Sequence, residues 1–164
     1  MKTLIHYLED IGGKRGLGLL IHATGVILIC WIPGQLVWFA FHYTCPGPTE
    51  ENFYKTPLQA LTVTILLAPI LETQMMRMIF FALGKFIRGN FVLCGVSAVI
   101  WGLLHVASES WGIHAAWAFF LMGICFRRLQ ETSMTRAIRL TALIHAGCNV
   151  LSYGLFLLLS SFTA

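Results

Sequence analysis

Charged side chains are scarce in this sequence: Asp, Glu, Lys and Arg make up 11% of its 164 residues, whereas hydrophobic residues make up 57%. A soluble domain usually contains about 25% charged residues. The core of a chain this short is too small to bury so much apolar surface in water. The composition therefore excludes an ordinary soluble domain. It predicts an all-α, polytopic membrane protein that forms one compact transmembrane helical bundle.

Paired cysteines and internal repeats are also lacking. The five cysteines include no CxxC pair, and four of them lie in apolar segments, where cysteine behaves as a small hydrophobic residue. Neither a disulfide framework nor a zinc ribbon is therefore expected. The absence of an inverted repeat argues against a small proton-coupled carrier. The net charge of +4 comes from basic residues in short connections, so it indicates membrane topology and no nucleic-acid partner.

Five apolar segments are predicted to form membrane-spanning helices. They cover about residues 17–41, 58–84, 91–107, 112–126 and 134–159. The preceding segment, 1–16, is expected to be cytoplasmic or interfacial. It has apolar residues at helical spacing, so we expect a helix at the membrane surface, with Leu4, Ile5, Leu8 and Ile11 on its apolar face, or a frayed tail. Residues 17–164 then form a single transmembrane domain.

Basic residues alternate between the two sides of the predicted spans. They occupy the N-terminal segment and the connections at 84–90 and 127–139, whereas the Pro- and Gly-rich loop at 42–57 and the connection near Glu109 are mainly acidic. Lys and Arg are enriched in cytoplasmic loops. We therefore predict five spans with the N-terminus inside and the C-terminus outside.

Several of these spans contain polar side chains that are costly in a bilayer. A charge at the bilayer centre, such as Glu72 or Arg77, costs about 3 kcal/mol or more, and function is the usual reason for its presence. Helical rise places Glu72, His105 and His145 roughly 17–21 Å from the inner ends of their spans. This depth is near the middle of a hydrocarbon core about 30 Å thick. Asn149 lies one turn beyond His145 on the same face, so the four side chains are expected to meet.

These four side chains suit the hydrolysis of an amide by an activated water. A carboxylate shielded from water is a stronger base once ionised, so Glu72 with His105 could hold and deprotonate a water. His145 and Asn149 could donate hydrogen bonds to the oxyanion that forms on the attacked carbonyl. One alternative is a zinc site formed by Glu72, His105 and His145. Another is a catalytic thiol at Cys148, although a thiol in apolar surroundings needs a neighbouring cation for activation.

The polar segments resemble the motifs of the CAAX-protease and bacteriocin-processing family, also called the abortive-infection family of intramembrane proteases. The family pattern is EExxxR, then FxxxH, then HxxxN or HxxxD, each on a membrane helix. This chain has ETQMMR at 72–77, WGLLH at 101–105 and HAGCN at 145–149. The resemblance covers about residues 66–151 and implies a protease-like core at about 58–159. It also implies that Glu72 and His105 activate water, that His145 and Asn149 form the oxyanion hole, and that no metal or other cofactor is needed.

Two positions depart from the family pattern. Trp101 replaces the phenylalanine of the second motif, which keeps an aromatic side chain. Thr73 replaces the second glutamate, one turn before Arg77, and can only form hydrogen bonds. Arg77 therefore needs another partner or must extend toward the inner membrane face. This departure leaves open a non-catalytic immunity or scaffold protein of the same fold.

The resemblance also implies the kind of substrate and its location. The expected substrate is a membrane-anchored or membrane-delivered peptide, such as a C-terminal sorting tail, a lipidated C-terminus or a bacteriocin-type precursor. The expected location is the bacterial inner membrane, where the lipid bilayer itself is a partner. The sequence leaves the oligomeric state open.

Overall fold

The computed structural model describes residues 2–44, 57–105 and 109–163. Within these ranges the chain is helical and contains no strand, which confirms the all-α prediction for this part of the protein. Most of the predicted loop at 42–57 and the end of the predicted span at 91–107 lie outside these ranges. The elements in order are α1 (Lys2–Glu9), the 3₁₀ helix η1 (Asp10–Gly13), α2 (Gly16–Thr44), α3 (Pro57–Leu61), the π-helix η2 (Thr62–Leu67), α4 (Ala68–Leu83), α5 (Asn90–Leu104), α6 (Glu109–Thr132) and α7 (Met134–Thr163).

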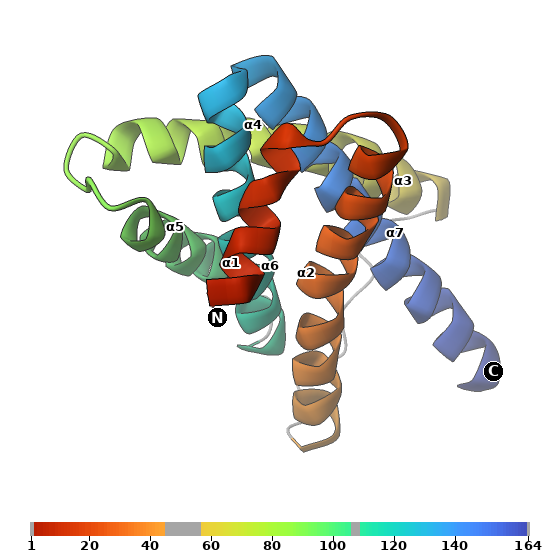
Figure 1. The fold of residues 1–164 in the computed structure, drawn as a ribbon. Helices are drawn as coiled ribbons and strands as arrows, with labels where there is room; N and C mark the ends of the chain where they lie inside the picture. The colour runs from red at the N-terminus through yellow and green to blue at the C-terminus, as the bar shows by residue number, and fades with distance from the viewer. Residues whose placement is uncertain (1, 45–56, 106–108, 164) are drawn as a thin grey trace.

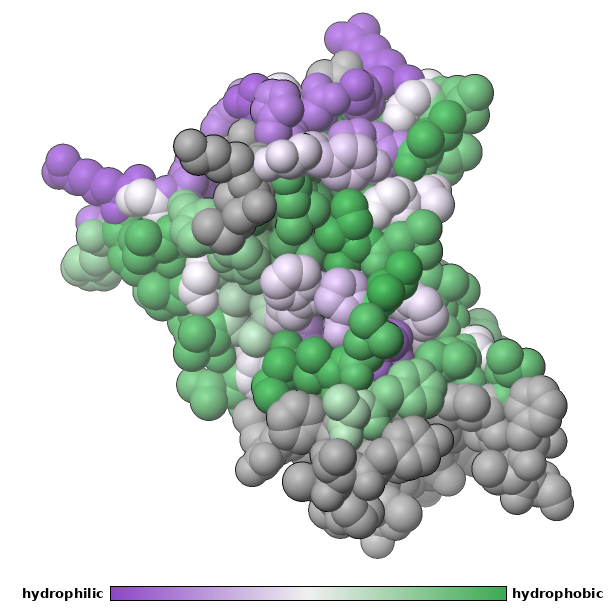
Figure 2. All heavy atoms as spheres, turned by 60° about the horizontal axis from the view of Figure 1, so that its bottom comes forward, coloured by the Kyte–Doolittle hydropathy of each residue, from purple (hydrophilic) through white to green (hydrophobic). Residues whose placement is uncertain are grey.

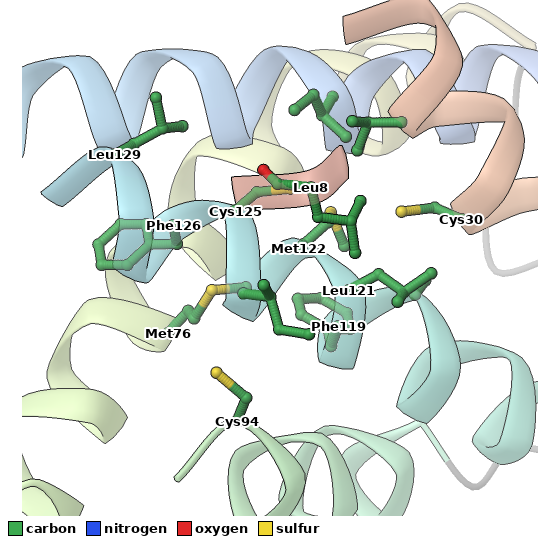
Figure 3. Close-up of a cluster of buried hydrophobic side chains, with 14 of the residues drawn as sticks. Leu8, Cys30, Met76, Cys94, Phe119, Leu121, Met122, Cys125, Phe126 and Leu129 are labelled. Atoms are coloured by element: carbon green, nitrogen blue, oxygen red, sulfur yellow. The ribbon is translucent and has the colours of Figure 1, made fainter. Parts of the chain in front are cut away.

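Helix α6 lies at the centre of the fold and packs against α5, α2 and α7 (Figure 1). Six of its apolar side chains are buried and meet side chains from four other helices (Figure 3). Because lipid tails are as apolar as these side chains, close packing rather than exclusion of water would hold such a core together in a membrane. The α6 side chains in this cluster are Phe119, Leu121, Met122, Cys125, Phe126 and Leu129, and they meet Leu8, Cys30, Met76 and Cys94.

Helices α5 and α6 approach each other closely because small residues face one another. A Cβ atom at Gly102 would lie 3.0 Å from the Gly112 carbonyl oxygen and 3.1 Å from the Ala116 Cβ. Small residues at such contacts allow two helix backbones to pack at short range. The approach brings the end of α5, which carries His105, close to α6.

The predicted span at 58–84 is one continuous rod that contains a π-helical turn, which the sequence analysis did not anticipate. The turn η2 ends directly before α4, where Ala68 N–H bonds to the Val63 carbonyl in the wider π register. The next residue, Pro69, has no N–H and cannot continue either ladder. The π-helix is rare and occurs mostly as single turns inside α-helices, and in membrane helices such local adjustments accommodate a proline. In Figure 1 the rod of α3, η2 and α4 crosses α2 steeply.

Among the described residues, two segments are apolar and long enough to cross a membrane, 16–37 in α2 and 62–83 in the rod, and α5 is a shorter apolar helix. Figure 2 shows hydrophilic residues gathered at one end of the molecule above a largely hydrophobic surface. Exposed apolar patches of this extent are typical of contact with a membrane or a partner. Examples on α2, α4 and α5 that are at least 60% exposed are Leu20, Ile21, Leu71, Met78, Phe81, Val99 and Leu103.

The predicted basic connection at 127–139 is mostly helical, so the predicted end of the preceding helix at residue 126 is wrong. Helix α6 extends to Thr132, well beyond the predicted end at residue 126, and α7 begins at Met134. Arg128 pairs with Glu131 at i+3, and Arg127 donates to Gln130 at i+3, so the basic residues support the helix that they were expected to end. Ser133 alone separates the helices, and its Oγ accepts the Arg136 N–H as an N-cap.

The N-terminal helix forms but does not place its apolar face at a membrane surface. Leu8 and Ile11 are 0% exposed, and α1 packs against α6. The Cys125 thiol donates a hydrogen bond to the Leu8 carbonyl at 3.7 Å. The position expected for Leu8 and Ile11 is therefore corrected: tertiary packing buries this face inside the protein.

Candidate active site

Three helices bring a carboxylate and two imidazoles together. Glu72 lies in α4, His105 caps the end of α5, and His145 lies in α7. The Glu72 Oε2 atom is 3.6 Å from His145 Nε2 and 3.9 Å from His105 Nε2. Both separations exceed a direct hydrogen bond, so the three side chains converge without bonding directly to one another. Their side chains are 21% (Glu72), 9% (His145) and 31% (His105) exposed, so the carboxylate is largely shielded and His105 is the most exposed of the three.

The His105 ring is held in one orientation by the last turn of α5. Its Nδ1 lies 2.9 Å from the Trp101 carbonyl oxygen. A carbonyl can only accept, so Nδ1 carries the hydrogen of this bond. In the neutral ring the other nitrogen, Nε2, then has a lone pair, and this atom faces Glu72.

Phe119 of α6 is a part of the site that sequence reasoning missed. Its ring stacks on Trp101 at 4.1 Å and 7°, meets His145 edge-on at 5.2 Å and 81°, and lies 5.6 Å from the His105 ring. Phe119 is 3% exposed. It therefore forms a wall against both imidazoles. In the sequence it is one of several aromatic residues in an apolar segment, and no spacing singles it out.

Asn149 lies one turn after His145, but its amide is directed at the backbone of the π turn. Its Nδ2 donates to the Thr64 carbonyl at 2.7 Å. In a π-helix this carbonyl would accept from residue 69, which is Pro69 and has no N–H. In an α-helix it would accept from Ala68, whose N–H bonds to Val63 instead. Asn149 of α7 therefore donates to the Thr64 carbonyl, which has no backbone donor within the rod of α3, η2 and α4.

Thr73 and Trp101, the two residues that depart from the family pattern, are both buried. Thr73 is 1% exposed, and within the described ranges its hydroxyl has no hydrogen-bond partner. Arg77 is exposed, so the structure does not join these two side chains. Trp101 is 2% exposed and contributes its carbonyl to His105 and its ring to Phe119.

The structure also bears on the zinc and thiol alternatives. Among the residues that the structure describes, no group of three His, Cys, Asp or Glu side chains could hold a metal ion. The Cys148 thiol is also directed elsewhere, since it donates to the Ile27 carbonyl of α2 at 3.8 Å. The geometry thus brings together Glu72, His105 and His145 and turns Cys148 toward α2.

Comparison with known proteins gives one match. The model of the family described as type II CAAX prenyl endopeptidase Rce1-like matches residues 54–151, which include α3 to α6 and α7 as far as Leu151. No curated protein and no solved structure matches the chain. The match covers more than half of the 164 residues and includes Glu72, His105, His145 and Asn149. It confirms the suspected relation to the CAAX proteases, and the chain belongs to the Rce1-like family of type II CAAX prenyl endopeptidases.

Proposed function

We propose that the protein is an intramembrane endopeptidase in which Glu72 and His105 activate a water that attacks a peptide bond. The family is one of endopeptidases, and the apolar helices fit a membrane protein. The observation that carries the proposal is the convergence of one Glu72 oxygen and two imidazole nitrogens from three helices within 4 Å.

The geometry suits a water that donates both of its hydrogens. The Glu72 carboxylate and the lone pair on His105 Nε2 are both acceptors, and they lie 3.9 Å apart. A water oxygen about 2.8 Å from each atom fits above this separation. With both hydrogens engaged, its lone pairs point away toward a substrate carbonyl. Transfer of one proton to Glu72 or His105 as the oxygen attacks is general base catalysis.

His145 and Asn149 are proposed to stabilise the oxyanion. His145 Nε2 lies 3.6 Å from Glu72 Oε2. Asn149 uses one amide hydrogen on Thr64, and its second hydrogen remains available to a substrate oxygen. Donors positioned before the reaction stabilise the charge that develops in the transition state.

The proposed topology follows the charge pattern, and the proposed location and substrate follow the family resemblance. The protein would have five spans, with the N-terminus inside and the C-terminus outside, in the bacterial inner membrane. Its substrate would be a membrane-associated peptide such as a sorting tail, a lipidated C-terminus or a bacteriocin-type precursor. The reaction as proposed needs no metal or other cofactor, since Glu72 and His105 supply the base.

The test is cleavage of membrane-anchored reporter peptides of these three types by the purified protein in lipid vesicles. Glu72→Gln removes the base while keeping the shape, and the rate should fall at least about 100-fold. Glu131→Gln is the matched control, because Glu131 is an exposed carboxylate paired with Arg128 at the end of α6. Full activity of Glu72→Gln would refute the proposed base. Loss of activity on chelation, with recovery on adding Zn²⁺, would favour the zinc alternative instead.

A further inference from the structure

A groove of about 410 Å³ lies between the start of α2 and the first turns of α7. None of its lining residues belongs to the candidate active site. Its walls include Arg136, Arg139 and Ser133 at one end, and Leu19, Leu140 and Leu143 along its length.

The groove changes from charged to apolar along the axis of α7. Arg136 and Arg139 lie in its first turns, Leu140 is one turn beyond Arg136, and Leu143 is one turn beyond Arg139. The distance from Arg136 to Leu143 along the helix is about 10 Å. Leu143 is 64% exposed, so the apolar end opens outward. A ligand that fits this surface has an anionic end and an apolar end.

The positive charge at the groove is not neutralised by the described part of the chain, in which neither guanidinium forms a salt bridge. Arg136 donates to the Lys14 backbone carbonyl, which fixes its position and leaves its charge unpaired. The nearest acid along the chain to Lys14, Asp10, pairs with Lys14 at 2.6 Å. Glu131 pairs with Arg128.

We propose that this groove binds one anionic phospholipid. The phosphate lies against Arg136 and Arg139, with the Ser133 hydroxyl nearby, and one acyl chain lies along Leu19, Leu140 and Leu143. Arginine clusters beside a membrane helix attract anionic head groups. A soluble phosphate would contact only the charged end, whereas a lipid fills the whole groove. This inference rests on the proposed placement of α2 and α7 in a membrane and not on protease activity.

Native mass spectrometry of the full-length protein in detergent tests the proposal, with phosphatidylglycerol and phosphatidylcholine as probes. One phosphatidylglycerol should bind at least about 10-fold more tightly than phosphatidylcholine. The double variant Arg136→Gln, Arg139→Gln should lose this preference. The matched control is Lys85→Gln, Arg88→Gln, which removes the same charge from two exposed residues between α4 and α5. Equal affinity of the wild type for both lipids, or an equal loss in the control, would overturn the proposal.

A second arm separates a lipid from a phosphate and does not depend on the arginine variants folding. Leu143→Trp fills the apolar end at an exposed position and should weaken phosphatidylglycerol binding while leaving the thermal unfolding temperature unchanged. The soluble head group glycerophosphoglycerol should not compete at the same concentration. Competition by the head group alone, or unchanged lipid binding in Leu143→Trp, would show that the acyl chain does not occupy the groove. These binding results are independent of whether Glu72 cleaves a peptide.

Discussion

Trp101 shows how a residue can depart from its family pattern and still support the site. The bond that orients His105 comes from the Trp101 backbone carbonyl, which any side chain at this position would leave in place. The side chain has a different task, since its ring stacks on Phe119 and Phe119 meets both imidazoles. An aromatic residue is therefore needed, whereas phenylalanine as such is not. Thr73 differs, because its buried hydroxyl gives Arg77 no partner.

Phe119→Leu should lower kcat about 10- to 100-fold with a small change in KM, because small misplacements of catalytic groups are costly. The leucine removes the edge-on contact that orients His145 and the stacked contact with Trp101. Each aromatic pair contributes about 0.5–1.5 kcal/mol, so some loss of stability is also expected. Steady-state cleavage kinetics and thermal unfolding in detergent measure the two effects.

Phe120→Leu is the matched control for this change. Phe120 is the next residue in α6, and its ring meets Phe91 edge-on at 5.2 Å on the α5 side. The Phe120→Leu variant should lose a similar amount of stability and keep the kcat of the wild type. Equal losses of kcat in the two variants would assign Phe119 a structural role only.

Among the helical elements, the π turn before α4 links the backbone of one site helix to a side chain of another. Pro69 leaves the Thr64 carbonyl without a helical donor, and Asn149 of α7 supplies one at 2.7 Å. A buried carbonyl without a partner is costly in an apolar setting. The bond therefore fixes α7, and with it His145, against the rod that carries Glu72.

A double-mutant cycle between Pro69→Ala and Asn149→Ala tests this link. Asn149→Ala alone should lower the free energy of unfolding by about 1 kcal/mol, as for hydrogen bonds between membrane helices. In the Pro69→Ala variant, residue 69 has an N–H that can donate to a carbonyl of the rod itself. Asn149→Ala should therefore lower the free energy of unfolding by clearly less in this background. Ser152→Ala is the control, because Ser152 accepts hydrogen bonds from Trp31 and Gln35 of α2 and should be additive with Pro69→Ala. Additivity of the Asn149 pair would contradict the link.

The helices and the convergence of Glu72, His105 and His145 could be predicted from sequence, because both follow from local periodicity and helical rise. Helical rise along each segment was enough to place Glu72, His105 and His145 at one depth, and the structure brings them together. The Asn149 bond to Thr64 could not be predicted, because it depends on a π register that forms only in the folded rod.

Contacts set by tertiary packing were equally beyond the sequence. The ring of Phe119 acquires its neighbours only when α5, α6 and α7 meet, and Leu8 is buried only because α1 lies on α6. The extension of α6 beyond residue 126 was missed for a different reason. Basic residues suggested a connection there, although Arg128 forms a helical pair with Glu131.

At the scale of the whole molecule, the segment outside the family match covers the site helices. Helix α2 packs against α6 and α7, and Trp31 and Gln35 both donate to Ser152 of α7. The Ile27 carbonyl of the same helix accepts the Cys148 thiol, within the motif that contains His145. Helix α2 therefore completes the packing around α7, although the matched family segment begins at residue 54.

A fragment of residues 54–164 lacks α2, so α7 should be packed less tightly in it than in the full chain. Cys148 is 4% exposed in the full chain and lies against α2, so in the fragment it should react with a membrane-permeant maleimide at least about 10-fold faster, corresponding to an opening free energy lower by about 1.4 kcal/mol. Cys94 of α5 is the internal control, because it is 1% exposed and packs against Gly123 of α6. Co-expression of residues 1–44 as a separate chain should restore protection of Cys148, together with any cleavage activity that the fragment has lost. Labelling followed by mass spectrometry distinguishes the two thiols. Protection of Cys148 in the fragment alone would mean that α6 and the rod are sufficient to position α7, and that α2 is dispensable for the site.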